Sequence, residues 1–248
     1  MTDYVREHTV GDLLSSSVAV YRQHFKSFFV AYAVPALPLP VLQAEFDRGG
    51  KYAAALFAAV ANFLVVGTAT GAITVMVSDA CLGRPVSARH AYRLLFAGRV
   101  GKVIRTTLLV GLAIVGSLLL LVLPFFIVYP STMIAVPVAV LEGKGAGSAF
   151  RRSWRLSKGL RWRNLGVFLL ALFVVVALII GVSLSLGILL AALSTDESST
   201  GRILSIAGVI LGTLIVPAVL VLNVLLYYDS RVRHEGYDSA ALSSDLHW

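Results

Sequence analysis

Residues 143–166 read GKGAGSAFRRSWRLSKGLRWRNLG, a stretch with seven cationic residues and no acidic one between two long apolar runs. A helix over residues 148–158 would sort its side chains into distinct faces. Arg151, Arg155 and Lys158 would lie largely opposite two neighbouring rows, which are Ala149, Arg152 and Leu156 and then Phe150, Trp154 and Ser157. This pattern is typical of an amphipathic helix that lies at a membrane surface.

The cations of this stretch predict a site for anionic phospholipid. Their charged heads can contact lipid phosphate, and each cation near the surface contributes about 1 kcal/mol. The apolar side chains expected to enter the headgroup boundary are Phe150, Trp154, Leu156 and Trp162. The predicted lipid-binding residues, called the basic collar from here on, are Arg151, Arg152, Trp154, Arg155, Lys158, Arg161, Trp162 and Arg163. The alternative is a topogenic loop, whose positive charge keeps it in the cytoplasm and has no further role.

The composition is that of a multi-pass membrane protein. Of the 248 residues, 58% are hydrophobic and only 14% are charged, which is far from the composition of a soluble domain. Six spans of roughly 20 residues each would leave no room for a soluble catalytic domain. The net charge of +8 comes from cations beside apolar segments, which favours membrane phospholipid over nucleic acid as the partner. The single cysteine, Cys81, excludes an internal disulfide.

We predict an all-α fold of six transmembrane helices and three amphipathic interfacial helices. The interfacial helices are expected after Thr9, after Ser87 and over residues 148–158, with Thr9 and Ser87 as N-caps. The six spans are expected over residues 25–42, 52–77, 103–122, 125–141, 165–193 and 203–227. Leu123 and Pro124 form the predicted turn between the third and fourth spans, because the apolar run there is too long for one helix. Prolines in the first, fourth and sixth spans predict kinks.

The distribution of cations predicts the orientation in the cell membrane. The expected cytoplasmic segments hold 18 lysines and arginines and comprise residues 1–27, 79–105, 142–164 and 228–248. The opposite turns hold only Arg48, Lys51 and Arg202. Since positively charged loops stay in the cytoplasm, both termini are expected there.

The three amphipathic stretches resemble one another and suggest an internal repeat. Each carries an aromatic residue followed by arginine, namely Tyr21-Arg22, Tyr92-Arg93 and Trp154-Arg155. The whole chain would form one integral membrane domain with repeat units over residues 9–78, 86–141 and 146–228, a cytoplasmic tail over 229–248, and a possible pseudo-threefold arrangement. The alternative is that any amphipathic helix before a span shows such a pair.

Each predicted hairpin returns to the cytoplasm at an acidic residue, which is Asp79, Glu142 or Asp229. A carboxylate at the interface is costly unless a cation compensates it. We therefore expect structural ion pairs between these acids and Arg93, Arg155 and Arg22 or the neighbours of those arginines.

Five short segments resemble one known family. They are residues 9–14 (TVGDLL), 21–25 (YRQHF), 140–145 (VLEGKG), 149–156 (AFRRSWRL) and 226–233 (LYYDSRVR). Together they resemble the membrane domain found with glycerophosphoryl diester phosphodiesterases, over nearly the whole chain. The resemblance implies the fold and the membrane location. Some members carry a catalytic domain fused behind the membrane part, and since this chain ends at Trp248 without one, we expect no diesterase activity.

Patterns for catalysis or metal binding are missing from the sequence. The five histidines show neither His-x-x-x-His nor Glu-x-x-His spacing, and no phosphate-binding loop is present. We therefore expect no catalytic residue, no metal and no cofactor. No acid or base falls at mid-membrane depth in the predicted spans, which disfavours an ion-coupled pump.

Some small and polar residues of the spans are predicted to serve helix packing. Asn62 and Asn223 are expected to form hydrogen bonds between helices more often than they would bind a transported ligand. The glycines expected at close helix contacts are Gly67, Gly71, Gly181, Gly187, Gly208 and Gly212.

Three functions follow, in descending order. The first is a non-enzymatic integral membrane protein that binds anionic phospholipid through the basic collar and organises or scaffolds the membrane. The alternative is a transporter or channel for a lipid or small amphiphile, which a continuous polar cavity would favour. An intramembrane enzyme ranks last because no acid–base cluster is present. The sequence indicates neither a protein partner nor an oligomeric state.

Overall fold

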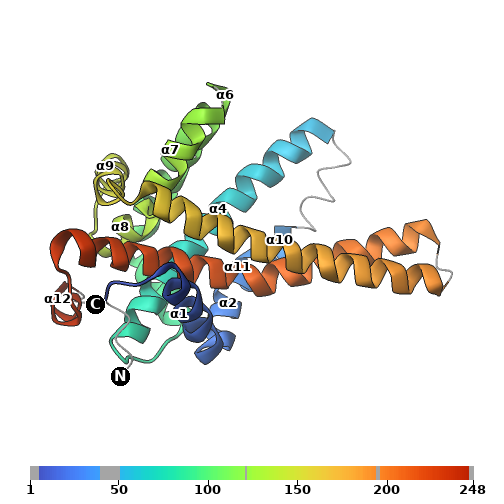
Figure 1. Ribbon diagram of the computed structural model, residues 1–248, viewed down its shortest axis with the longest axis horizontal. Helices are drawn as coiled ribbons and strands as arrows, with labels where there is room; N and C mark the ends of the chain where they lie inside the picture. The colour runs from blue at the N-terminus through green and yellow to red at the C-terminus, as the bar shows by residue number, and fades with distance from the viewer. Residues whose placement is uncertain (1–5, 40–50, 121, 194–195, 246–248) are drawn as a thin grey trace.

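The computed structural model describes residues 6–39, 51–120, 122–193 and 196–245, and within these ranges it contains helices and no strand. The all-α prediction is confirmed for this part of the chain, which Figure 1 shows. The helices are α1 (Val10–Gln23), α2 (Phe25–Ala36), α4 (Lys51–Cys81), α5 (Ala88–Leu94), α6 (Val100–Leu119), α7 (Val122–Thr132), α8 (Ala135–Leu141), α9 (Ala146–Leu156), α10 (Arg161–Ala192), α11 (Glu197–Glu235) and α12 (Ser239–Asp245). A π-helical turn, η2 (Leu95–Arg99), joins α5 to α6.

Five helical segments of the described chain are long and apolar enough to cross a membrane. They are Leu56–Cys81, Ala88–Leu119, Leu123–Leu141, Arg161–Ala192 and Ser199–Glu235. The predicted first span corresponds to α2, an apolar helix of 12 residues, which is shorter than the roughly 20 residues of a full span. Residues 40–42 of that span and residues 43–50 of the turn that follows lie outside the described residues. The multi-pass architecture is thus shown, and the sixth span stays a prediction.

The N-caps of α1 and α5 are those that the sequence predicts. The Thr9 hydroxyl accepts a hydrogen bond from the N–H of Asp12, and the Asp12 carboxylate accepts one from the N–H of Thr9. This capping box satisfies two donors that the helix end would otherwise leave unpaired. The Ser87 hydroxyl accepts the N–H of His90 at the start of α5.

The turn between the third and fourth spans lies earlier in the chain than predicted. α6 ends at Leu119 and α7 begins at Val122, so Leu123 and Pro124 belong to the first turn of α7. Proline is favoured there because the N–H that it lacks has no partner in the first turn of a helix. The fourth span is also interrupted, since α7 and α8 are separate helices.

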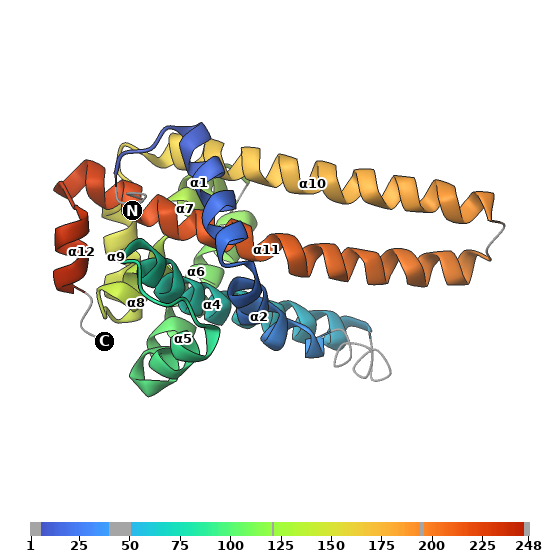
Figure 2. The ribbon, with the colours of Figure 1, turned by 90° about the horizontal axis from the view of Figure 1, so that it is seen from below.

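The longest hairpin consists of α10 and α11, which lie side by side and extend away from the other helices in Figures 1 and 2. Span six was predicted to end at Tyr227, but α11 continues to Glu235. Gly236, which has a φ of 61°, ends the helix in the left-handed conformation that favours glycine. The charged residues from Asp229 to Glu235, which were predicted to begin the cytoplasmic tail, therefore lie on this helix.

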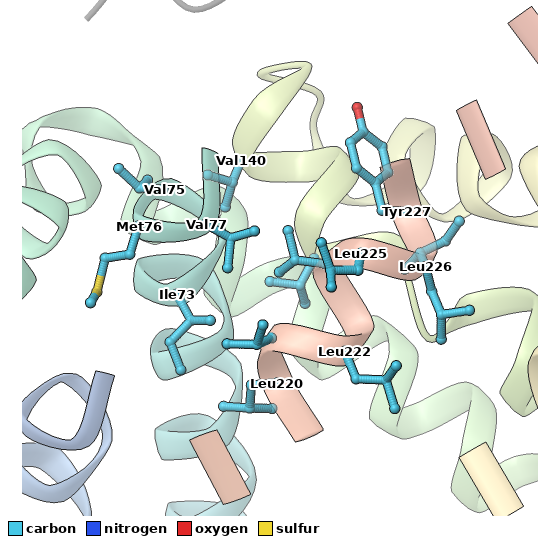
Figure 3. Close-up of a cluster of buried hydrophobic side chains, with 14 of the residues drawn as sticks. Ile73, Val75, Met76, Val77, Val140, Leu220, Leu222, Leu225, Leu226 and Tyr227 are labelled. Carbon is cyan, nitrogen blue, oxygen red and sulfur yellow. The ribbon is translucent and has the colours of Figure 1, made fainter. Parts of the chain in front are cut away.

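The buried core lies where α4, α8 and α11 meet, as Figure 3 shows. Ile73, Met76 and Val77 of α4 contact the same cluster as Val140 of α8 and Leu225 of α11, and all five are fully buried. The part of α10 far from this core is different, because side chains such as Phe173 and Ile188 are about 70% exposed. Side chains of this kind are suited to contact with lipid.

Two of the predicted packing glycines lie at close helix contacts. A methyl group at Gly67 would stand 2.3 Å from the hydroxyl oxygen of Thr107, and one at Gly71 would stand 3.2 Å from a methyl of Leu95. α4 therefore approaches α6 and η2 as closely as small residues allow. The prediction does not hold for the four glycines of α10 and α11, which face open space in the described chain; these are Gly181, Gly187, Gly208 and Gly212.

The order of the helices is the one that three repeat units require. α1 precedes α2 and α4, α5 precedes α6 and α7, and α9 precedes α10 and α11. The pseudo-threefold relation between the units stays a prediction.

Candidate functional site

The basic segment forms helix α9, which begins two residues before the predicted start. Gly143 allows the chain to leave α8, since its φ is 62°, and Gly145 is the N-cap of α9. The Gly143 carbonyl accepts a hydrogen bond from the Lys102 ammonium at 2.8 Å. This contact ties the start of α9 to the cation-rich beginning of α6.

One face of α9 is buried against α6, α7 and α8. Ala149, Ser153 and Leu156 form this face and are almost fully buried. The Ser153 hydroxyl donates to the Ser131 carbonyl at 2.8 Å. Because this face is fixed on the bundle, the opposite face of α9 is presented outward.

The outward face of α9 carries exposed cations beside aromatic rings. Arg151, Arg155 and Lys158 are exposed, and the rings of Phe150 and Trp154 stack with centroids 6.2 Å apart. A hollow of about 490 Å³ lies on this face and is lined by Lys144, Ser148, Phe150, Arg151, Trp154 and Arg155. We call these lining residues together with Lys158 the exposed face of α9. Cations around aromatic rings suit an anionic group with an apolar neighbour.

Arg152 points into the protein and pairs with two acids. Its Nε lies 3.0 Å from Glu142 Oε2, and its Nη2 pairs with Glu235. Burial lowers the pKa of Arg152, but the two carboxylates outweigh burial and raise the pKa above its usual value. Glu142 also pairs with Lys144 and accepts a hydrogen bond of 3.4 Å from the hydroxyl of Tyr227.

Arg163 forms a second internal ion pair, at the start of α10. Its Nη1 donates to Asp229 Oδ2 at 2.6 Å, and its Nη2 donates to the His8 carbonyl at 2.6 Å. Asp229 is fully buried and also pairs with Arg233 at 3.1 Å. Arg233 in turn donates to the His8 carbonyl at 2.8 Å. We call the two networks together the ion-paired base, which comprises Glu142, Arg152, Arg163, Asp229, Arg233 and Glu235.

The N-terminal segment joins this base through its backbone. The N–H of His8 donates to Asp229 Oδ1 at 2.8 Å, while its carbonyl accepts the two arginines. The His8 side chain is buried, and neither ring nitrogen has a hydrogen-bond partner among the described residues. Burial lowers the pKa of His8, so that its ring is neutral at pH 7.

The two remaining members of the basic collar lie at the start of α10. The Arg161 guanidinium stacks over the Trp154 ring, 4.7 Å from its centroid, which is a cation–π arrangement. Trp162 is 73% exposed. Of the eight predicted lipid-binding residues, the structure thus brings Arg152 and Arg163 into internal ion pairs and leaves Arg151, Arg155, Lys158 and Trp162 exposed.

Glu142 and Asp229, which were predicted to form structural ion pairs, pair with cations other than Arg22, Arg93 and Arg155. Glu142 pairs with Lys144 and Arg152, and Asp229 pairs with Arg163 and Arg233. The predicted partners Arg22, Arg93 and Arg155 are exposed. Asp79 is buried near the end of α4 and lines a hollow together with Arg84 and His90.

Sequence reasoning missed the contribution of the last turns of α11. Arg231 pairs with Glu235, donates to the Tyr227 hydroxyl at 3.2 Å and stacks over the Tyr237 ring. The signal was present in the spacing, because residues four apart on a helix are neighbours. Tyr227, Arg231 and Glu235 follow this spacing, as do Asp229 and Arg233. The predicted end of the span at Tyr227 concealed the pattern.

The cation-rich segments gather at one end of the molecule. Contacts of Arg163 with His8 and Asp229, of Lys102 with Gly143, and of Arg152 with Glu235 join all four segments that were predicted to be cytoplasmic. In Figures 1 and 2, α9, α12 and the end of α11 lie at the end of the molecule opposite the tip of the α10–α11 hairpin. Among the described residues, no group of three or more metal-ligating side chains is brought together.

The bundle of apolar helices defines a multi-pass integral membrane protein. The chain matches the family model for the membrane domain of glycerophosphoryl diester phosphodiesterase over residues 103–238, which is more than half of its length, and so it belongs to that family. The match runs from α6 to just beyond α11 and includes residues 140–145, 149–156 and 226–233, three of the segments that carry the resemblance. It concerns the membrane domain and no catalytic domain. No match is found among curated proteins or among solved structures.

Proposed function

We propose that this chain is a non-enzymatic protein of the cell membrane that binds anionic phospholipid through the exposed face of α9 and thereby organises or scaffolds the membrane. The observation that carries the proposal is the division of α9 into two faces. One face is buried in the bundle through Ala149, Ser153 and Leu156, and the other presents Arg151, Arg155 and Lys158 beside Phe150 and Trp154.

The internal ion pairs support this role because they hold the exposed face in place. Arg152 fastens α9 to the end of α11, and Arg163 fastens the start of α10 to α11 and to the N-terminal segment. These two arginines are already compensated by carboxylates, so they have little capacity left for lipid phosphate. The proposed lipid-binding set therefore narrows to Arg151, Arg155 and Lys158, assisted by Arg161 and the aromatic residues.

The proposed orientation places both termini and α9 in the cytoplasm. It is supported by the 18 cations in the four segments that meet at one end of the molecule and by the rule that positive segments are retained inside. In this orientation the exposed face of α9 meets the leaflet that carries most anionic lipid in cells.

The test uses the full-length protein with three exposed cations neutralised as Arg151→Gln, Arg155→Gln and Lys158→Gln. Wild type and variant are reconstituted in nanodiscs that contain phosphatidylglycerol and phosphatidylcholine, and the lipids that remain bound are quantified by mass spectrometry. Since each cation contributes about 1 kcal/mol at low salt, we expect the enrichment of phosphatidylglycerol to fall at least about tenfold. The effect should shrink at high salt, because ions screen exposed charges.

A matched control removes the same charge elsewhere at the same end. Arg22, Arg89 and Arg93 are exposed residues of α1 and α5, and their replacement by glutamine changes the net charge equally. We expect this control to keep most of the phosphatidylglycerol enrichment. Equal loss in the two triple variants would leave only the topogenic role of the positive charge, and the proposed lipid site would be wrong.

The alternative, a transporter or channel for a lipid or small amphiphile, ranks second. The cavity among α4, α6, α7, α10 and α11 is lined mostly by apolar side chains, and it does not provide the continuous polar path that would favour transport. Enzymatic activity finds no support in the site either, because the described acids there are engaged with arginines and lysine.

A further inference from the structure

A second site lies at membrane depth, away from the exposed face of α9. It is a cavity of about 360 Å³ among helices that belong to all five membrane-spanning segments. The volume falls within the range of roughly 300–1,000 Å³ that small-molecule sites occupy. Since the surrounding medium at this depth is lipid, any occupant must come from the hydrocarbon layer or be compatible with it.

Most of the lining is apolar, and part of the polar lining is satisfied within its own helix. Phe63, Ile114, Phe168 and Val219 are among the apolar residues of the wall. The hydroxyl of Thr70 donates to the Val66 carbonyl at 2.7 Å, and that of Thr132 donates to the Val128 carbonyl at 2.8 Å. No charged side chain lines the cavity, so an ionised ligand group would remain uncompensated there.

Two polar atoms of the wall lack a hydrogen-bond partner in the described chain. They are the hydroxyl oxygen of Thr107 and the amide oxygen of Asn223. Thr107 is only 4% exposed, and the expectation that Asn223 bonds to a neighbouring helix is not met for this oxygen. A buried polar atom without a partner is costly at membrane depth. The cavity therefore combines an apolar wall with two unsatisfied acceptors.

We propose that this cavity binds one hydrocarbon chain of a neutral lipid that carries a hydroxyl group. The chain would fill the apolar part of the cavity, as hydrocarbon fills other apolar cavities of proteins. The hydroxyl group can donate to Asn223 and can both donate to and accept from the Thr107 hydroxyl. The absence of charged groups from the lining selects a neutral hydroxyl over a phosphate or carboxylate. This site is separate from the headgroup site on α9 and does not depend on it.

The experiment uses the full-length protein in nanodiscs and two photoreactive probes with the same alkyl chain. One probe is hexadecanol with a diazirine on its chain, and the other is its methyl ether, which cannot donate a hydrogen bond. We expect saturable labelling of the parts of α6, α10 and α11 that line the cavity. The loss of one hydrogen bond should weaken labelling by the ether about fivefold.

Variants separate the cavity from the general lipid surface. Val219→Phe fills the cavity and should reduce saturable labelling at least about fivefold, whereas Val174→Phe makes the same change at an exposed position of α10 that does not line the cavity and should leave labelling unchanged.

Two further variants test the polar atoms of the wall. Asn223→Leu should remove the preference for the alcohol over the ether. Thr107→Val should weaken labelling by both probes. Thr106→Val is the control for Thr107→Val, because Thr106 is buried next to Thr107 but lies outside the lining.

Three results would overturn the proposal. The first is labelling that spreads evenly over the lipid-facing helices, the second is equal labelling of wild type and Val219→Phe, and the third is equal labelling by alcohol and ether. A cavity filled with water would give the first or second result. Neutralisation of Arg151, Arg155 and Lys158 should leave cavity labelling unchanged, so failure of the surface site and failure of this site are distinguishable.

Discussion

Arg151 and Arg152 are neighbours in the sequence, yet they belong to two regions with different roles. Arg151 lies on the exposed face of α9 and lines its hollow. Arg152 belongs to the ion-paired base, where it bridges Glu142 and Glu235. The same division separates the exposed Trp162 from Arg163, which holds the buried Asp229. A run of positive charge can thus supply both an exposed cationic surface, for which we propose lipid binding, and the internal ion pairs that position this surface.

The largest effect is expected from breaking the base at its most buried member. Asp229→Asn should lower the free energy of unfolding by about 3–5 kcal/mol, because it leaves Arg163 and Arg233 without their buried carboxylate. The free energy of unfolding is measured in detergent, with circular dichroism as the signal that monitors unfolding. Glu7→Gln is the matched control, since Glu7 pairs with the same Arg233 from an exposed position and should cost less than about 1 kcal/mol. Equal effects of the two variants would show that burial does not distinguish these carboxylates.

The second effect concerns helix packing, which differs between the core and the long hairpin. Gly67→Ala should destabilise by about 1–3 kcal/mol, because the new methyl group would overlap the Thr107 hydroxyl. Gly208→Ala should instead stabilise by about 0.5–1 kcal/mol, since no atom lies within 4 Å of the added methyl group and alanine has the higher helix propensity. The same unfolding measurement compares them. A large loss for Gly208→Ala would reveal a packing partner on α11 outside the described chain.

Local patterns in the sequence were sufficient to predict the helical class and the N-caps of α1 and α5. Thr9 was predicted as an N-cap, and the structure shows it in a capping box with Asp12. The spacing of Ala149 and Leu156 likewise predicted that they share one face of α9, but this face is buried against the bundle and Leu156 does not enter the headgroup boundary as the amphipathic pattern predicted. These features depend on residues a few positions apart, which the sequence displays directly.

Which of several similar residues forms an internal contact depends on distant parts of the chain. This could not be predicted from local patterns. Arg151 and Arg152 look alike until Glu142 and Glu235 are brought to α9. Gly67 and Gly208 share a glycine spacing, but only Gly67 meets a neighbouring helix. The hydroxyl of Thr107 and the amide of Asn223 line one cavity only because α6 and α11 both border it. Long-range contacts of this kind decide which residues form the ion-paired base and which line the cavity.

The third effect compares the two neighbouring arginines directly. Arg152→Gln should lower stability by about 1–2 kcal/mol, because it leaves the half-buried Glu142 and Glu235 without one cation each. Arg151→Gln should stay within about 0.5 kcal/mol of wild type and should reduce phosphatidylglycerol enrichment instead. Both properties can be measured on the same two preparations. If Arg151→Gln destabilised the protein as much as Arg152→Gln, the division of the collar into two regions would be wrong.

The smallest effect is a pH dependence of stability that we expect from His8, which contacts the ion-paired base through its backbone. Burial lowers the pKa of His8 below 6.5 in the folded protein. The backbone of Arg6 and the carboxylates of Asp229 and Asp12 act in the opposite direction, while the charge of Arg6 adds to the lowering. Well above pH 6.5 the His8 ring is neutral in the folded protein and in the unfolded chain, so the protein keeps its full stability there.

As the pH falls through and below 6.5, the unfolded chain takes up a proton at His8 before the folded protein does, so stability decreases with acidification. His8→Gln keeps the backbone contacts with Asp229, Arg163 and Arg233 and should flatten this slope between about pH 7.5 and pH 5.5. The measurement is the free energy of unfolding across that range for both proteins. Binding of phosphatidylglycerol by the exposed face of α9 should not follow the same slope, because His8 does not belong to that face. A slope that persisted unchanged in His8→Gln would assign the pH dependence to another group.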